Sequence, residues 1–199
     1  QYRSLLINSA APFTPADSDV PFPVQRTGAG ALYLPAALQS TVTAFPTSLS
    51  FGVGGSTVDA SRDLTLTNIG KTADGFAISV APMGSGPAPA ASAGSLQLAA
   101  GALQTITLRL NATALEPGEY QGFVLVQGAG MAQPVRIPYW YAVPSNTPYY
   151  VTVLRARESG APGAFLRNAV YFRVTESSGI SLLDTNPTVT VVSGGGSVQ

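Results

Sequence analysis

The sequence predicts an all-β protein built mainly from an antiparallel β-sandwich. Between residues 45 and 143, short runs of alternating apolar residues are separated by Gly, Pro, Asn and Asp, at the spacing of about 8 to 12 residues that is typical of a sandwich. The chain also holds 21 Gly and 16 Pro. These residues suit many tight turns, because Gly tolerates positive φ and Pro fixes φ. The same composition argues against a helical bundle.

The charge balance and two missing residue types exclude several functions. Ten basic residues balance ten acidic ones, so we expect no long-range attraction of nucleic acid or of an anionic membrane. The chain has no His and no Cys, so it cannot build a Ser-His-Asp triad, a His-ligated catalytic metal or a disulfide. No apolar run reaches the roughly 20 residues that span a bilayer. We therefore expect no catalysis by residues 1–199, and no membrane span.

Two short helices are predicted ahead of the sandwich. Residues 2–11 place apolar side chains near a helical period, and Pro12 stops the helix. After a Pro-rich loop and the turn Gly28-Ala29-Gly30, a second helix is predicted to begin near Pro35.

The Pro-rich loop offers the only weak metal candidates. Asp17 and Asp19 could supply oxygen ligands for calcium, which takes about six to eight of them. Two carboxylates in such a loop are more often solvated, so solvent exposure is the favoured interpretation and a calcium site is the weaker one. No other cofactor is expected.

Seven strands are predicted within the sandwich. In the third of them, Phe76, Ile78 and Val80 share one face. A loop rich in Gly, Ala, Pro and Ser covers residues 84–94. The predicted strands are residues 47–53, 64–68, 76–81, 96–98, 105–110, 120–127 and 135–142.

Leu115, Pro117, Gly118 and Tyr120 mark one corner of the predicted sandwich. Their spacing matches the tyrosine corner of immunoglobulin-like and fibronectin type III folds, in which the Tyr hydroxyl bonds to nearby backbone. We therefore expect a structural role for them. The aromatic run of residues 139–141 is open to two interpretations, a carbohydrate platform or sandwich core, and strand alternation favours the core.

A polar segment, residues 145–148, separates the sandwich from a shorter region. Strands are predicted there at residues 149–154, 169–175 and 188–192. With about 50 residues this second sandwich would be incomplete. Its four arginines are offset by two glutamates, so a solvated face is expected; these residues are Arg155, Arg157, Arg167, Arg173, Glu158 and Glu176.

The first 40 residues resemble the end of the catalytic domain of subtilisin-like serine proteases. Residues 3–10, Arg-Ser-Leu-Leu-Ile-Asn-Ser-Ala, resemble that family's "L-x-N-T-A" helix, and residues 28–30 and 36–38 resemble its "G-A-G" turn and closing helix. In the family the catalytic serine precedes this helix. The resemblance thus implies that the chain is excised from a longer precursor and carries none of the triad.

The later patterns resemble domains that accompany such proteases. The series "P-x-S-L-S-F-G", "L-T-N-I-G", "G-x-Y-x-G-F-V-x-V" and "I-P-Y-W" resembles the fibronectin type III-like domain of secreted subtilases, and also major-sperm-protein-like sandwiches. Residues 170–179 and 189–198 resemble the first half of a bacterial immunoglobulin-like repeat of the invasin and intimin type, with Glu176 at its acidic position.

These resemblances imply three parts: a catalytic-domain tail (1–43), a fibronectin-like sandwich (44–144) and a partial immunoglobulin-like domain (145–199). The implied function is a non-catalytic accessory region of a secreted bacterial endopeptidase, partnered by the catalytic domain of its own precursor or by a protein or cell-surface polymer. The alternative is a cell-surface adhesion or spacer protein of tandem immunoglobulin-like domains.

Overall fold

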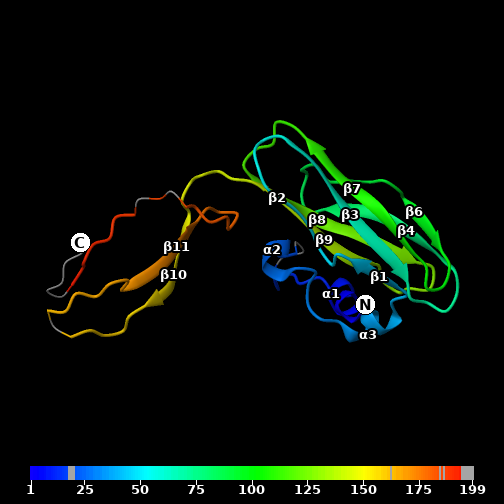
Figure 1. The fold of residues 1–199 in the computed structure, drawn as a ribbon, viewed down its shortest axis with the longest axis horizontal. Coiled ribbons are helices and arrows are strands. Elements are labelled where there is room, and N and C mark those ends of the chain that lie inside the picture. The colour runs from blue at the N-terminus through cyan, green and yellow to red at the C-terminus, as the bar shows by residue number, and fades with distance from the viewer. Residues whose placement is uncertain (18–20, 162, 184, 186, 194–199) are drawn as a thin grey trace. The chain divides into compact units, whose positions relative to one another are not determined.

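The computed structural model describes residues 1–17, 21–161, 163–183, 185 and 187–193 (Figure 1). It divides into two compact units, Gln1–Val143 and Pro144–Gln199. Within the described ranges, no helix is long and apolar enough to cross a bilayer.

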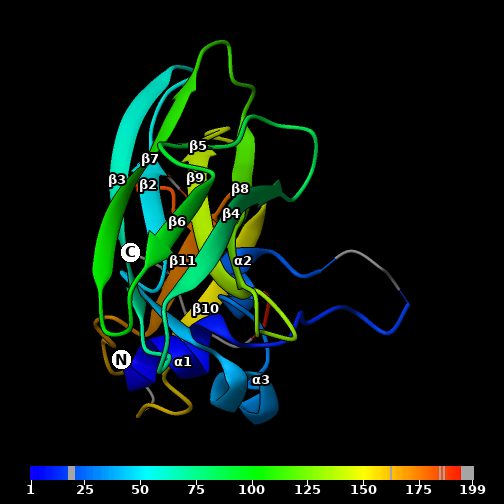
Figure 2. The same cartoon turned by 90° about the vertical axis from the view of Figure 1, so that its right-hand side faces the viewer.

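The first unit is a β-sandwich, which confirms the predicted fold class. Figure 2 shows its two sheets packed face to face. One sheet has the order β1-β3-β7-β5 and the other β2-β9-β8-β4-β6. The strands are β1 (Val42–Phe45), β2 (Leu49–Val53), β3 (Val58–Asn68), β4 (Asp74–Pro82), β5 (Ala90–Ala91), β6 (Ser95–Leu98), β7 (Leu103–Ala112), β8 (Gly118–Gly128) and β9 (Val135–Val143).

The first predicted strand, residues 47–53, corresponds to β2, whereas β1, which belongs to the other sheet, was not predicted. β1 pairs antiparallel with β3, and after the cis peptide Phe45–Pro46 the chain continues into β2, which pairs parallel with β9. The other pairings of the sandwich are antiparallel. The short β5 lies inside the segment predicted as a loop, where it pairs with the middle of β7.

The core of the sandwich is formed by the inward faces of the predicted alternating runs. Side chains two residues apart point to the same face of a strand, and eight of them, from five strands, are fully buried. They are Leu64, Leu66, Phe76, Leu108, Leu110, Val124, Val126 and Ile137.

Within residues 1–17 and 21–41, three helices precede the strands: α1 (Tyr2–Asn8), α2 (Val24–Thr27) and α3 (Leu34–Gln39). α1 and α3 cover the two predicted helical segments, although α1 ends three residues earlier than expected. The four-residue α2 lies where only a loop and turn were predicted. α1 contacts β1, β9 and α3, and α2 contacts β9. The helices and the sandwich therefore belong to one unit.

The second unit contains one two-stranded antiparallel sheet, β10 (Tyr150–Ala156) with β11 (Val170–Thr175). The prediction of a third strand at residues 188–192 is wrong. The structure describes these residues as exposed and without strand pairing. An alternating pattern becomes a strand only where a neighbouring strand accepts its hydrogen bonds, and residues 188–192 pair with none.

A buried glutamate organises the start of the second unit. The Glu176 side chain is 1% exposed, and its carboxylate accepts hydrogen bonds from the Ser145 N–H and hydroxyl, the Asn146 N–H and the Ser178 hydroxyl. Burial by itself raises the pKa of this carboxyl, but the hydrogen bonds outweigh burial and hold the pKa below its usual value. The segment after Val143 is thereby fastened to the end of β11.

Replacing a core side chain should destabilise the sandwich strongly. We expect Leu66→Ala to lower the free energy of unfolding by about 2–5 kcal/mol, because it removes buried methyl groups and leaves a cavity. Urea unfolding followed by the fluorescence of Trp140, the single tryptophan, measures this. The control is Leu103→Ala at a side chain that is 64% exposed, for which a change within about 0.5 kcal/mol is expected. Equal losses would contradict the placement of the core.

The Glu176 contact should weaken only in acid. Because the folded-state pKa is lowered, its stabilisation is complete above the ordinary glutamate value of about 4.3 and is lost as the pH falls through the folded-state value. An NMR titration of the Ser145 and Asn146 amide protons should therefore show a midpoint below about pH 4.3, the ordinary glutamate value. Glu176→Gln should abolish the titration and Glu158→Gln should leave it intact. A midpoint above 4.3 would contradict the predicted sign.

Candidate functional site

The most distinctive feature outside the core is the attachment of α1 to the corner where the chain crosses between the sheets. Ser4 and Asn8 lie one helical turn apart, and both are buried although they are polar. The Asn8 Nδ2 donates to the carbonyl oxygens of Thr47 (2.9 Å) and Arg136 (3.0 Å). The Ser4 hydroxyl donates to Asn8 Oδ1 (3.0 Å) and accepts the Ala44 N–H (2.8 Å).

This corner needs such partners because strand pairing stops there. β2 pairs with β9 only from Tyr139 onward, so the Arg136 carbonyl lies on a stretch of β9 that β2 does not reach. Ala44 lies on β1, an edge strand of the other sheet. Unpaired backbone groups at buried edges are costly. The two side chains of α1 satisfy them, and α1 thereby closes the sandwich.

A second set of contacts holds α2 and the following turn on the outer face of β8 and β9. The Val24 N–H donates to Gln121 Oε1 (2.8 Å), and Gln121 Nε2 donates to Glu119 Oε2 (2.9 Å). The Arg136 guanidinium lies 3.9 Å from the centroid of the Phe123 ring and donates to the Ala29 carbonyl (3.4 Å). Burial lowers the pKa of Arg136, yet an arginine stays charged at neutral pH.

The turn Gly28-Ala29-Gly30 requires its last glycine. Gly30 has φ of +125°, and a Cβ there would lie 1.9 Å from the carbonyl oxygen of Ala11. The approach is close because Ala11 and Ala31 form an isolated antiparallel bridge. The sequence motif therefore marks a backbone contact inside the helical layer.

The outward side of the helical layer is apolar. On α1 the exposed residues Tyr2 (84%) and Leu6 (43%) lie roughly opposite Ser4 and Asn8 around the helix. The neighbouring α3 exposes Leu38 (86%) and Leu34 (53%), again one turn apart. The usual arrangement, with polar residues outside and apolar residues inside, is thus inverted on α1. We call these four side chains the outer apolar stripe.

The predicted corner residues lie together where β7 leads into β8. The Tyr120 hydroxyl donates to the carbonyl of Glu116 (2.8 Å), and the buried Leu115 donates its N–H to the Ser56 carbonyl (2.8 Å). Gly118 has φ of +156°, and Pro117 lies immediately before it. The hydrogen bonds of Tyr120 and Leu115 tie this corner to the backbone of other residues, and the structural role of the four residues stays a prediction.

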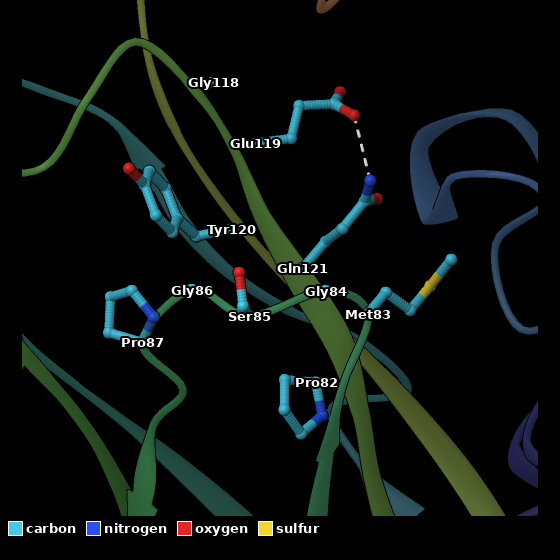
Figure 3. Close-up of a pocket in the computed structure, with 10 residues that line it drawn as sticks. All are labelled: Pro82, Met83, Gly84, Ser85, Gly86, Pro87, Gly118, Glu119, Tyr120 and Gln121. Carbon is cyan, nitrogen blue, oxygen red and sulfur yellow. Dashed lines mark hydrogen bonds between the residues drawn. The ribbon is translucent and has the colours of Figure 1, made fainter.

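A shallow pocket of about 320 Å³ lies beside this corner, between the loop after β4 and the start of β8 (Figure 3). Tyr120, Glu119 and Gln121 line one side, and Met83, Ser85 and Gly86 line the other. The Tyr120 hydroxyl and the Glu119 carboxylate already have partners. The lining offers the Ser85 hydroxyl as a nucleophile and the Glu119 carboxylate as a base, but no hydrogen bond joins the two among the described residues.

The calcium candidates are not brought together within the described residues. Asp17 is exposed, and Asp19 lies outside the part of the chain that the structure describes. That part contains no group of three acidic side chains able to hold a metal ion. The aromatic run divides as strand alternation requires: Tyr139 and Tyr141 are buried in the core, where burial raises the pKa of Tyr139 to about 12.

Sequence reasoning missed Ser4, Asn8 and Gln121 as anchoring residues. Asn8 stands inside the quoted protease-like motif, but a motif does not state what its amide contacts. One signal was available, because Ser4 and Asn8 lie one turn apart on the same face of the predicted helix, where they can act as a pair. The partners themselves are more than 35 residues away in sequence.

Comparisons with known proteins address the fold only. No protein-family model matches the chain, and no curated protein matches it. A PapD-like domain of human CEP192 is 16% identical over 53% of this chain and 86% of its own, with a TM-score of 0.44. The CupB2 chaperone of Pseudomonas aeruginosa is 10% identical over 52% of this chain and 55% of its own, with a TM-score of 0.41. The secreted serine protease VesC of Vibrio cholerae is 19% identical over 52% of this chain and 26% of its own, with a TM-score of 0.37. The sandwich assignment rests on the two sheets themselves.

Removing the Asn8 amide should loosen the helical layer. We expect Asn8→Ala to cost about 1–3 kcal/mol of stability, because the Thr47 and Arg136 carbonyls lose their donor in a buried site. Urea unfolding of the whole chain, followed by Trp140 fluorescence, measures the change. Leu6→Ala, on the exposed face of the same helix, should change stability by less than about 0.5 kcal/mol. A smaller loss for Asn8→Ala than for Leu6→Ala would refute this role.

Proposed function

We propose that this chain is a non-catalytic accessory region of a secreted subtilisin-like endopeptidase, and that it stabilises or positions the catalytic domain of the same precursor. The outer apolar stripe would be the surface that meets that domain. In this proposal the protein is secreted or displayed at the cell surface, and residues 1–199 perform no proteolysis themselves.

The observation that carries the proposal is the inverted amphipathic character of α1. Its Ser4 and Asn8 side chains are occupied by hydrogen bonds to each other and to the sandwich, while Tyr2 and Leu6 remain in solvent. Neighbouring exposed apolar side chains are characteristic of surfaces that meet another protein. The protease-like motifs occur on this same layer, in the order in which the family has them at the end of its catalytic domain.

The composition supports an accessory role over a catalytic one. Hydrolysis by a serine nucleophile needs a general base in contact with it, and histidine, the usual base, is absent from the sequence. Calcium is not needed for the proposed role. A tandem immunoglobulin-like adhesion protein remains the second candidate, and the observation that favours it is the additional β10–β11 sheet after the sandwich.

The coding sequence on either side of this chain tests the proposal directly. We expect upstream segments with the Asp, His and Gly-Thr-Ser motifs of the protease family. Their absence would refute the proposal, and several more sandwich repeats downstream with a surface anchor would favour the adhesion protein.

The stripe itself is tested in the whole precursor. Leu6→Ser combined with Leu38→Ser should lower the melting temperature of the catalytic domain, because the docked surface loses apolar area. The matched control is Leu103→Ser combined with Val53→Ser, at exposed residues of the sandwich, and it should leave that temperature unchanged. Scanning calorimetry of the precursor, with peptide hydrolysis as a second readout, measures both. Equal effects of the two pairs would contradict docking through the stripe.

A further inference from the structure

The β10–β11 sheet has two chemically different faces. Residues that are paired across two strands lie on the same face of a sheet. Val151 pairs with Val174, and Val153 pairs with Phe172, so these four form an apolar face. On the opposite face Thr152 pairs with Arg173. A bulge at Leu154 shifts the register of β10 by one residue, so that Arg155 lies on the same face as Thr152.

After that bulge Arg155 pairs with Tyr171, two residues from Arg173 along β11. Tyr150, at the other end, pairs with Thr175. We call the five exposed residues of this side the arginine–tyrosine face: Tyr150, Thr152, Arg155, Tyr171 and Arg173. Successive rows on one face of a sheet lie about 7 Å apart.

The arginine–tyrosine face carries positive charge without a compensating carboxylate. Among the described residues, neither Arg155 nor Arg173 has a hydrogen-bond or ion-pair partner. The expected offset by Glu176 does not occur, because that carboxylate is 1% exposed and is occupied by Ser145, Asn146 and Ser178. Both arginines are exposed to solvent, as the sequence predicts, but Glu176 is not the partner of either.

We propose that the arginine–tyrosine face binds an acidic polysaccharide. Guanidinium groups form charge-assisted, often bidentate hydrogen bonds with carboxylates. Tyrosine rings offer flat apolar faces, with a polar edge, to the C–H side of a sugar. Tyr150 and Tyr171 are 47% and 46% exposed, so each ring is half available while its base is held by the sheet. The Thr152 hydroxyl adds a donor and acceptor between the rows.

The charge on the face favours a sparsely charged polymer over nucleic acid. Nucleic-acid binding depends on neutralising many closely spaced phosphates. This face has two arginines, and the whole chain has a net charge of zero, so no strong field assists such binding. A polyuronate presents carboxylates together with apolar sugar faces, which matches the alternation of arginine and tyrosine. This proposal does not depend on the protease relationship, since it uses residues of the second unit only.

The test is affinity electrophoresis of the whole chain through gels that contain alginate, a polyuronate, or dextran, a neutral glucan. We expect retardation by alginate alone, weakened by added NaCl because exposed charges are screened. Arg155→Gln combined with Arg173→Gln should raise the dissociation constant about tenfold or more, since each arginine contributes charge-assisted hydrogen bonds. Tyr171→Ser should weaken binding with the charge unchanged.

The matched control removes two exposed arginines elsewhere, Arg3→Gln combined with Arg26→Gln, and should leave alginate binding within about twofold, because it changes only the net charge. Circular dichroism establishes that each variant is folded. The proposal is overturned if alginate does not retard the chain, if dextran retards it equally, or if the two arginine pairs have the same effect. Tighter binding of an oligo-dT single strand than of alginate would overturn it in favour of nucleic acid.

Discussion

The organisation of the first unit depends on the hydrogen bonds that Ser4 and Asn8 make at the corner of the sandwich. Where the chain passes from β1 to β2, it leaves one sheet and joins the other, so backbone groups on both edges lose regular partners. Two side chains of one helix replace them. Because a buried polar group without a partner costs about 1–3 kcal/mol, the helix and the corner stabilise each other.

This constraint determines which side of α1 remains available. The side that carries the polar pair must face the sandwich, so Tyr2 and Leu6 must face away from it. The exposure of Tyr2 and Leu6 in the outer apolar stripe is therefore a consequence of the hydrogen bonds that Ser4 and Asn8 make to the backbone at the corner. Because α2 and Gln121 hold the next segment on β8 and β9, the helical layer is a fixed part of the unit.

In the second unit, as in the first, hydrogen-bond partners stabilise a buried polar group, and here that group is charged. Burying Glu176 is tolerated because several donors surround its carboxylate. Because Glu176 is buried, it does not pair with Arg155 or Arg173, whose guanidinium groups have no ion-pair partner among the described residues. Charge counting along the sequence treats Glu176 as a partner of these arginines, whereas its burial removes it from their exposed face. The electrostatic character of the face is thus decided by a hydrogen-bond network.

The sequence alone determined the sandwich and its core, because period-two alternation at residues such as Leu64, Leu66, Leu108 and Leu110 dictates which side of a strand is buried. Turn-forming residues likewise fixed the corner at Tyr120. Only the tertiary structure decided that β1 and β2 join different sheets, which groups Asn8 contacts, and that the Glu176 carboxylate is buried. The strand placement and the partners of Asn8 depend on residues that are distant in sequence, and the burial of Glu176 depends on the hydrogen-bond donors around its carboxylate. The periodicity of a short stretch of sequence carries no information about such contacts.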